Sequence, residues 1–196
     1  MSGVPVLLAA DTVSVTVEAV LVGAHHLDPP HVSFVAVTTA VPGVVVTGHG
    51  VASGRNGDPR FPGGTIAMQT PHLAAAGVDL SGFHPATVNL SVTPMRLVIA
   101  SPAITVHDLR WHRVEPPEDF SFVDCRIGHA PDDLVAGLVY HPHPDTKPEH
   151  HQPDTVVEVL APYLAGVAAG VGLWLAVDPT QAHFEPTDTP GHDPAG

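Results

Sequence analysis

The sequence predicts an all-β protein, a closed or nearly closed β-barrel that carries one short helix. Short runs rich in Val and Thr recur along the chain, with Pro and Gly between them. Only one segment has a helix-start signal followed by a helix-stop signal, and there is no internal repeat. Many short strands with frequent turn residues are typical of barrels and related all-β folds.

The expected strands follow one another at short intervals. They occupy residues 12–22, 31–39, 44–51, 87–92, 96–100, 120–127, 134–140, 155–160 and 172–177. Residues 161–177 carry no charge, but 17 residues with three glycines and one proline are short for a membrane span. We therefore expect a turn and a buried strand there, and no membrane segment.

The one expected helix is short and well punctuated. Thr70 can act as the N-cap, Pro71 as the first helical residue and Gly77 as the C-terminal stop. The helix should therefore cover about 71–76.

The chain is expected to divide into three parts. Residues 1–46 form a β-rich N-terminal extension packed on the barrel, and residues 47–177 form the barrel itself. Residues 178–196 contain four prolines and almost no apolar side chains, so we expect a disordered tail.

The charge and cysteine content exclude several classes of protein. Seven Lys and Arg against 20 Asp and Glu give a net charge of −13, which disfavours nucleic acid and anionic membranes as partners. A phosphate site would need backbone amides, a metal or the few local arginines. Cys125 is the single cysteine, so no internal disulfide can form, and this fits a reducing cytoplasm. Asp11 and Glu18 interrupt the first apolar run, so no signal peptide is expected.

Residues 82–92, GFHPATVNLSV, combine a tight turn with an alternating strand. Alternation puts Thr87, Asn89 and Ser91 on one face and the apolar residues between them on the other. Hydroxyl and amide oxygens side by side on a strand suit a partly hydrated Mg²⁺, although Thr and Ser are also common on solvent-facing strands.

Three segments stand in order along the chain: GVASG at 50–54, GFHPATVN at 82–89 and HHQPDTVVEVLAP at 150–162. This order resembles the archaeal CTP-dependent riboflavin kinases. That family has a G-x-V-x-S-G entry to a glycine-rich nucleotide loop, then G-F-x-P-x-x-G-T-L-N, then T-H-H-P followed by L-E-I-I-A-P. Ala86 replaces a family glycine. The resemblance covers about residues 47–177 and implies a six-stranded cradle-loop barrel.

The resemblance also implies an activity, phosphoryl transfer from CTP or another nucleotide to riboflavin, giving FMN with Mg²⁺ as cofactor. Thr87 and Asn89 match the Mg²⁺ ligands. Glu158 matches a flavin-contacting glutamate and could orient the attacking hydroxyl as a catalytic residue, while His150 falls where a threonine meets the substrate. The residues expected to bind the nucleotide are Gly54, Arg55, Gly57, Tyr163, Leu164, Ala165 and Gly166, with Arg60 as an alternative to Arg55.

The chain departs from the family near its end. Leu164 and Ala165 replace an L-R pair, and residues 169–172 replace a D-G-D motif. These departures favour a second hypothesis, a barrel that has lost catalysis and binds a flavin-like molecule or a nucleotide, or serves in assembly.

The histidines suggest a third hypothesis, a metal-dependent enzyme. His141, His143, His150 and His151 lie within eleven residues, and His-x-His on a strand suits Zn²⁺. Paired histidines occupy this place in the resembled family without zinc, which makes zinc the less favoured cofactor. Further ligands could come from Asp124, Cys125 and His129.

Overall fold

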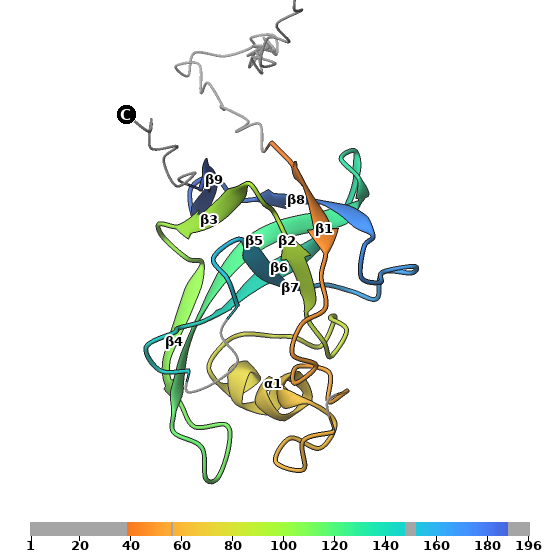
Figure 1. The fold of residues 1–196 in the computed structure, drawn as a ribbon. Helices are drawn as coiled ribbons and strands as arrows, with labels where there is room; N and C mark the ends of the chain where they lie inside the picture. The colour runs from red at the N-terminus through yellow and green to blue at the C-terminus, as the bar shows by residue number, and fades with distance from the viewer. Residues whose placement is uncertain (1–38, 56, 148–151, 188–196) are drawn as a thin grey trace, which may run out of the picture. The chain divides into compact units, whose positions relative to one another are not determined.

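The computed structural model describes residues 39–55, 57–147 and 152–187, and this part of the chain forms nine strands and one helix (Figure 1). The strand expected at 12–22 lies outside the described residues, and so does the strand expected at 31–39 except for its last residue. The elements are β1 (Val41–Val45), α1 (Thr65–Ala75), β2 (Val88–Ser91), β3 (Met95–Ile99), β4 (Ile104–Leu109), β5 (Glu118–Ala130), β6 (Asp133–Pro142), β7 (Val156–Leu160), β8 (Gly172–Val177) and β9 (Ala182–Pro186).

Six antiparallel strands close into a barrel, in the order β5, β6, β7, β2, β1 and β8, with β8 pairing back to β5. This confirms the expected all-β barrel with one short helix. β5 is 13 residues long, so its first half pairs with β4 and its second half with β8. β3 and β9 form a separate two-stranded sheet.

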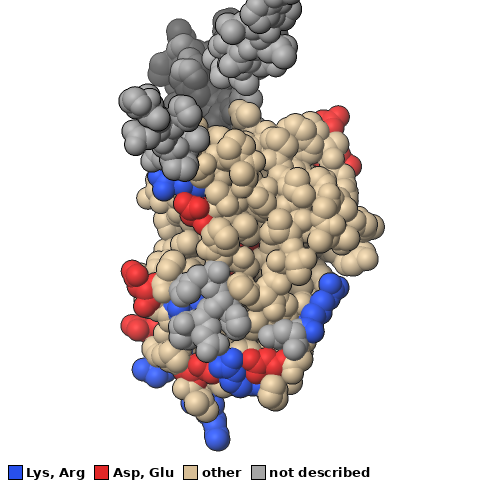
Figure 2. Space-filling view, viewed as in Figure 1, with Lys and Arg blue, Asp and Glu red and all other residues tan. Residues whose placement is uncertain are grey.

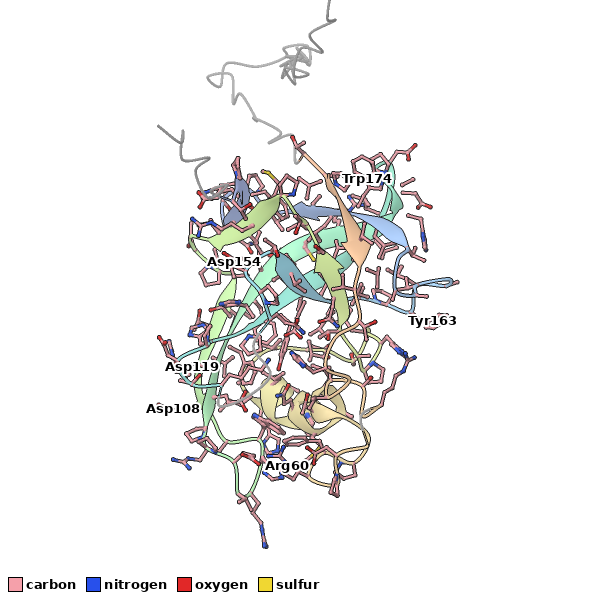
Figure 3. The ribbon with its side chains drawn as sticks, in the orientation of Figure 1. Arg60, Asp108, Asp119, Asp154, Tyr163 and Trp174 are labelled. Atoms are coloured by element: carbon pink, nitrogen blue, oxygen red, sulfur yellow. The ribbon has the colours of Figure 1, made fainter. Side chains whose placement is uncertain are left out.

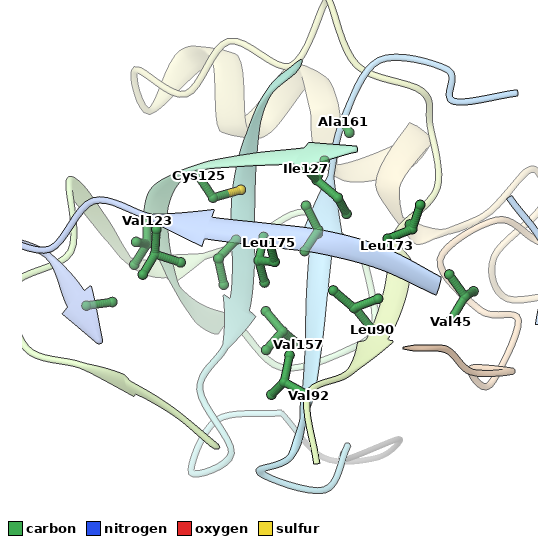
Figure 4. Packing of buried hydrophobic residues seen from close by; sticks show 14 residues of the cluster. Val45, Leu90, Val92, Val123, Cys125, Ile127, Val157, Ala161, Leu173 and Leu175 are labelled. Atoms are coloured by element: carbon green, nitrogen blue, oxygen red, sulfur yellow. The ribbon is translucent and has the colours of Figure 1, made fainter. Parts of the chain in front are cut away.

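Alternate residues of the barrel strands point inward, and because these residues are apolar the barrel interior is a hydrophobic core (Figure 4). Leu90 and Val92 are almost fully buried there, as the alternation in residues 87–92 predicts. Cys125 and Ile127 from β5 and Leu175 from β8 pack against them. The polar residues of β2 must therefore face outward, away from this core.

A second core lies on the outer face of the barrel wall. Some side chains of β5 and β6 point away from the barrel interior, on the face opposite to Cys125. They are Phe120, Phe122 and Tyr140, and they pack with Leu73 of α1. The 46–64 segment, the helix and β4 cover this part of the wall. This cover encloses the cavity described below.

The helix begins earlier than expected. It spans Thr65–Ala75 and its N-cap residue is Gly64. Glycine has no side chain to cap the first N–H groups, so the sequence gives no recognisable start signal before residue 65. The expected N-cap Thr70 instead lies inside the helix, where its hydroxyl donates to the Ile66 carbonyl at 2.7 Å. Pro71 is also internal, which removes one backbone hydrogen bond.

The expected helix stop is confirmed. Gly77 has φ +94° and its N–H bonds the Ala74 carbonyl, while the Val78 N–H bonds the Leu73 carbonyl at 2.9 Å. These two bonds form a Schellman motif, in which glycine adopts the left-handed conformation most easily. No helix of the described segments is long and apolar enough to cross a membrane.

Three other expectations need correction. β1 is a barrel strand that ends at Val45, so the barrel starts before residue 47 and the strand expected at 44–51 is mostly a loop. β9 pairs with β3 inside the segment expected to be a disordered tail, of which residues 188–196 lie outside the described part. β4 was not expected at all. The turn and strand expected across 161–177 are confirmed, since β8 is Gly172–Val177.

Candidate functional site

A cavity of about 540 Å³ lies on the outer face of the barrel wall, next to α1. It is lined by the 45–53 segment, the helix, the ends of β2, β6 and β7, and the 161–169 segment. Figure 3 shows Arg60 below α1 and Tyr163 near the segment after β7, and both residues line the cavity. Its volume is typical of a small-molecule site.

A row of polar side chains from three adjacent strands forms one wall. Asn89 of β2 pairs directly with Glu158 of β7. Val139 of β6 pairs with Val159 of β7, and in this antiparallel register the next pair of positions places Tyr140 beside Glu158. All three polar residues line the cavity. They lie on the same outer face of the wall, because the preceding and following residues of each strand point into the barrel.

The Gln152 side chain joins two members of the row. Its Nε2 donates to Asn89 Oδ1 at 3.1 Å and approaches Glu158 Oε1 at 3.4 Å. Lys147 Nζ lies 4.0 Å from Glu158 Oε2. Burial raises the pKa of Glu158, and Lys147 and Gln152 oppose this by stabilising the carboxylate. The carboxyl therefore sits in a desolvated site, where Lys147, Gln152 and His49 favour its charged form.

Thr87 places a buried hydroxyl next to this row. Its Oγ1 has no hydrogen-bond partner among the described residues, and the residue lines the same cavity. The Asn89 amide approaches Gly48 so closely that a Cβ there would lie 2.8 Å from Asn89 Cγ. Glycine at position 48 thus leaves room for the Asn89 side chain.

The oxygens of this wall fit a hard divalent cation. Thr87 Oγ1 has no hydrogen-bond partner in the described part of the chain, Asn89 Oδ1 has a second lone pair beyond its bond from Gln152, and Glu158 places a carboxylate beside them. Mg²⁺ is commonly bound through one or two carboxylates and keeps water or substrate oxygens as its other ligands. The expected Mg²⁺ ligands therefore face the cavity with a carboxylate beside them.

The glycine-rich loop folds tightly onto the start of α1. Gly54 and Gly64 have φ values of +71° and +95°, and a Cβ on Gly54 would lie 2.7 Å from the Gly64 nitrogen. The Thr65 N–H also bonds the Val51 carbonyl at 3.1 Å. Only glycine permits this backbone-to-backbone contact. The contact fixes the loop across one side of the cavity.

The cavity is lined by charges of both signs. Arg60 is held by Asp58 at 2.8 Å and Glu115 at 3.2 Å, whereas Arg55 is exposed and forms no ion pair with the described residues. Over the end of the molecule that holds α1, basic and acidic side chains gather together, while the face over β1 and β8 is almost free of them (Figure 2). Arg55 is therefore the arginine better placed to meet an anionic ligand.

The expected nucleotide-binding residues are only partly brought together. Arg55, Tyr163 and Leu164 line the cavity with the 46–53 segment. His150 lies outside the described residues. The expected residues that do not line the cavity are Gly54, Gly57, Ala165 and Gly166.

Sequence reasoning missed several polar side chains of this cavity, and Glu118 and Gln69 are the most deeply buried of them. Glu118 is 6% exposed at the start of β5, and burial raises its pKa to about 7 although Lys147 opposes the shift. Gln69 of α1 is 1% exposed and accepts a 2.9 Å hydrogen bond from the Tyr140 hydroxyl. The only signal for Glu118 and Gln69 was a polar residue at a core position. Recognising such a position requires the strand register for Glu118 and the true start of the helix for Gln69.

The histidine cluster has other partners. The His141 and His143 rings are 5.7 Å apart, but His143 Nε2 bonds Ser121 Oγ at 2.8 Å. Neither histidine lines the cavity beside α1. Within the described ranges no group of three or more His, Cys, Asp or Glu is placed to hold a metal, and His150 and His151 fall outside them.

The other suggested zinc ligands point elsewhere. Cys125 faces the barrel interior, where burial raises its pKa to about 12. Asp124 accepts a 2.8 Å bond from Gln181 Nε2, and His129 Nε2 bonds the Ala165 carbonyl at 2.9 Å. These three side chains do not converge on His141 and His143.

Comparison of the chain with protein-family models, with curated proteins and with solved structures finds no match.

Proposed function

We propose that the protein is a Mg²⁺-dependent phosphotransferase of the CTP-dependent riboflavin kinase type, acting on a hydroxyl of a flavin-like small molecule. The observation that carries this proposal is the pairing of Asn89 with Glu158 on a cavity wall, beside the Thr87 hydroxyl, which has no partner among the residues described. The order of the three sequence segments gives independent support.

The arrangement suits phosphoryl transfer, which depends mainly on positioning and on neutralising charge. A Mg²⁺ held by Thr87 and Asn89 would neutralise phosphate oxygens. Glu158 would orient the acceptor hydroxyl from the adjacent strand, and burial raises its pKa, which makes its carboxylate a stronger proton acceptor. Arg55 and backbone N–H groups of the glycine-rich loop would hold the remaining phosphate oxygens.

A second candidate is a barrel that binds the same class of ligand without transfer. Arg55, Arg60 and Lys147 are the only Lys or Arg among the described cavity-lining residues, and Arg60 already bonds two carboxylates. Ala165 stands where the family's L-R pair has its arginine, so that positive charge is missing here. This shortage of positive charge supports binding without efficient catalysis.

Incubating the protein with riboflavin, Mg²⁺ and each nucleoside triphosphate tests the proposal. Separation of the flavins by chromatography should reveal FMN with one nucleotide, in equal amount to the nucleoside diphosphate. Chelation of Mg²⁺ should abolish the product. Riboflavin binding without FMN from any nucleotide supports the second candidate, and a stoichiometric zinc ion required for activity supports the metalloenzyme hypothesis.

A further inference from the structure

One part of the cavity carries a buried hydrogen-bond donor beside a buried acceptor. Trp111 and Glu118 are each 6% exposed, and both line the cavity. Trp111 follows β4, and Glu118 begins β5. The Phe61 ring lies 5.7 Å from the Trp111 ring and lines the same cavity, so an aromatic surface lies beside the two polar groups.

Among the described residues, the buried Trp111 donor lacks a regular hydrogen-bond partner, and the Glu118 carboxyl beside it is desolvated by burial. The Trp111 Nε1–H makes no hydrogen bond of normal geometry, although it lies close enough to Glu118 to favour the charged carboxylate. The nearby Lys147 acts on the carboxyl at longer range. A buried donor without a regular partner and a desolvated carboxylate both cost free energy, which a complementary ligand can recover.

We propose that this part of the cavity binds the amide edge of a planar heterocycle. The Glu118 carboxylate would accept the ring N–H, and the Trp111 indole would donate to the adjacent ring carbonyl. Phe61 would contact the ring with its apolar surface. The ligand class is therefore a heterocycle with adjacent N–H and C=O groups, such as a flavin, a lumazine or a uracil. The proposal rests on the proposed function in taking this cavity as the ligand site.

The charges favour a ring over a phosphate at this position. Glu115 lines the cavity close to Glu118 and raises its pKa further, so an anion would meet two carboxylates. The phosphate-binding candidates Thr87 and Asn89 belong to the β2 side. β6 and β7 separate β5 from β2, which is three strand spacings or roughly 14 Å. The cavity can thus hold a ring at one side and a phosphoryl group at the other.

Methylation of the ring nitrogen provides the sharpest test. Riboflavin, 6,7-dimethyl-8-ribityllumazine and uridine are titrated against the protein without nucleotide or Mg²⁺, each beside its N3-methyl analogue, by fluorescence or calorimetry. At least one parent compound should bind, and its N3-methyl analogue should bind at least about tenfold more weakly. No binding by any parent compound, or equal binding of parent and analogue, would overturn the proposal.

Substitutions identify the groups responsible. Glu118→Gln and Trp111→Phe should each weaken binding of the parent compound about tenfold, and each should shrink the effect of methylation. Glu185→Gln, the same change at a carboxylate that pairs with Arg96 outside the cavity, should leave binding unchanged. Melting curves establish that each variant is folded. If Glu118→Gln binds both compounds as the unmodified protein does, the assignment is wrong.

The outcome is separable from that of the proposed function. Discrimination between parent and methylated rings without any phosphoryl transfer would keep this inference and remove the kinase. Transfer to riboflavin and N3-methylriboflavin with equal affinity would keep the kinase and remove this inference.

Discussion

Asn89 and Glu158 lie directly opposite each other on β2 and β7, and one side-chain amide, that of Gln152, reaches both. This relationship brings two residues 69 positions apart in the sequence onto one cavity wall. Strand pairing fixes it, because neighbouring residues on both strands point into the apolar barrel interior. The polar wall is thus a direct consequence of the register.

The buried carboxyl of Glu118 predicts a pH-dependent stability. Its pKa is raised from 4.5 to about 7, so the folded state keeps a proton that the unfolded state releases. This contribution to stability is present below pH 4.5 and is lost as the pH rises to about 7. Glu118→Gln should therefore raise the free energy of unfolding at pH 8 by up to about 3 kcal/mol.

Urea denaturation at pH 5 and pH 8 measures this effect. The increase in the free energy of unfolding caused by Glu118→Gln should be much smaller at pH 5 than at pH 8. Equal gains at the two pH values would show that the carboxyl titrates normally.

The contact between Gly54 and Gly64 predicts a strong sensitivity of the loop to side chains. Gly64→Ala should destabilise the protein by at least about 2 kcal/mol, since φ is +95° and a Cβ would lie 2.7 Å from the Gly54 nitrogen. Gly57→Ala is the matched control, because its φ is also positive but a Cβ there meets nothing within 4 Å.

Thermal unfolding compares the two glycine variants. Gly57→Ala should lower the stability only by the cost of a positive φ for alanine, about 1–2 kcal/mol. Equal losses for both variants would contradict the close packing of the loop.

The Tyr140 hydroxyl predicts a stabilising link between α1 and the barrel wall. Tyr140→Phe removes its 2.9 Å bond to the buried Gln69 and should cost about 1–3 kcal/mol. Tyr163→Phe makes the same chemical change at a side chain that is 75% exposed and should be nearly neutral. Chemical denaturation of both variants gives the comparison, and a neutral Tyr140→Phe would argue against this hydrogen bond.

The alternation around Asn89 could be predicted because a strand repeats every two residues, and a local pattern reveals which side chains share a face. The barrel followed from many such short runs. β4 and β9 were harder, because ITVHDL is interrupted by an irregularity with Asp108 at φ +51°, and AHFEP has only five residues and ends in a proline. Neither run has the clean alternation that marks a strand.

The start of α1 and the Glu118 side of the cavity depend on tertiary structure. Gly64 caps the helix without a side chain, so the more recognisable Thr70 and Pro71 gave a false start. Glu118 and Trp111 belong to segments with no motif, and only the pairing of β4 with β5 brings them to the cavity that Asn89 lines. Contacts of this kind arise from register between distant segments, which a single sequence does not specify.

The central claim is that the outward face of β2 binds the metal–phosphate group of a ligand, and Asn89→Ala tests it most directly. Binding of CTP and of the other nucleoside triphosphates is measured by calorimetry with and without Mg²⁺, in this variant and in Ser91→Ala. Ser91 is the control because it lies on the same face of β2 but does not line the cavity. We predict that Asn89→Ala weakens Mg²⁺-dependent binding at least about tenfold while Ser91→Ala leaves it unchanged, with both variants folded. Unchanged Mg²⁺-dependent binding in Asn89→Ala, or no binding of any nucleotide to the unmodified protein, would contradict the account.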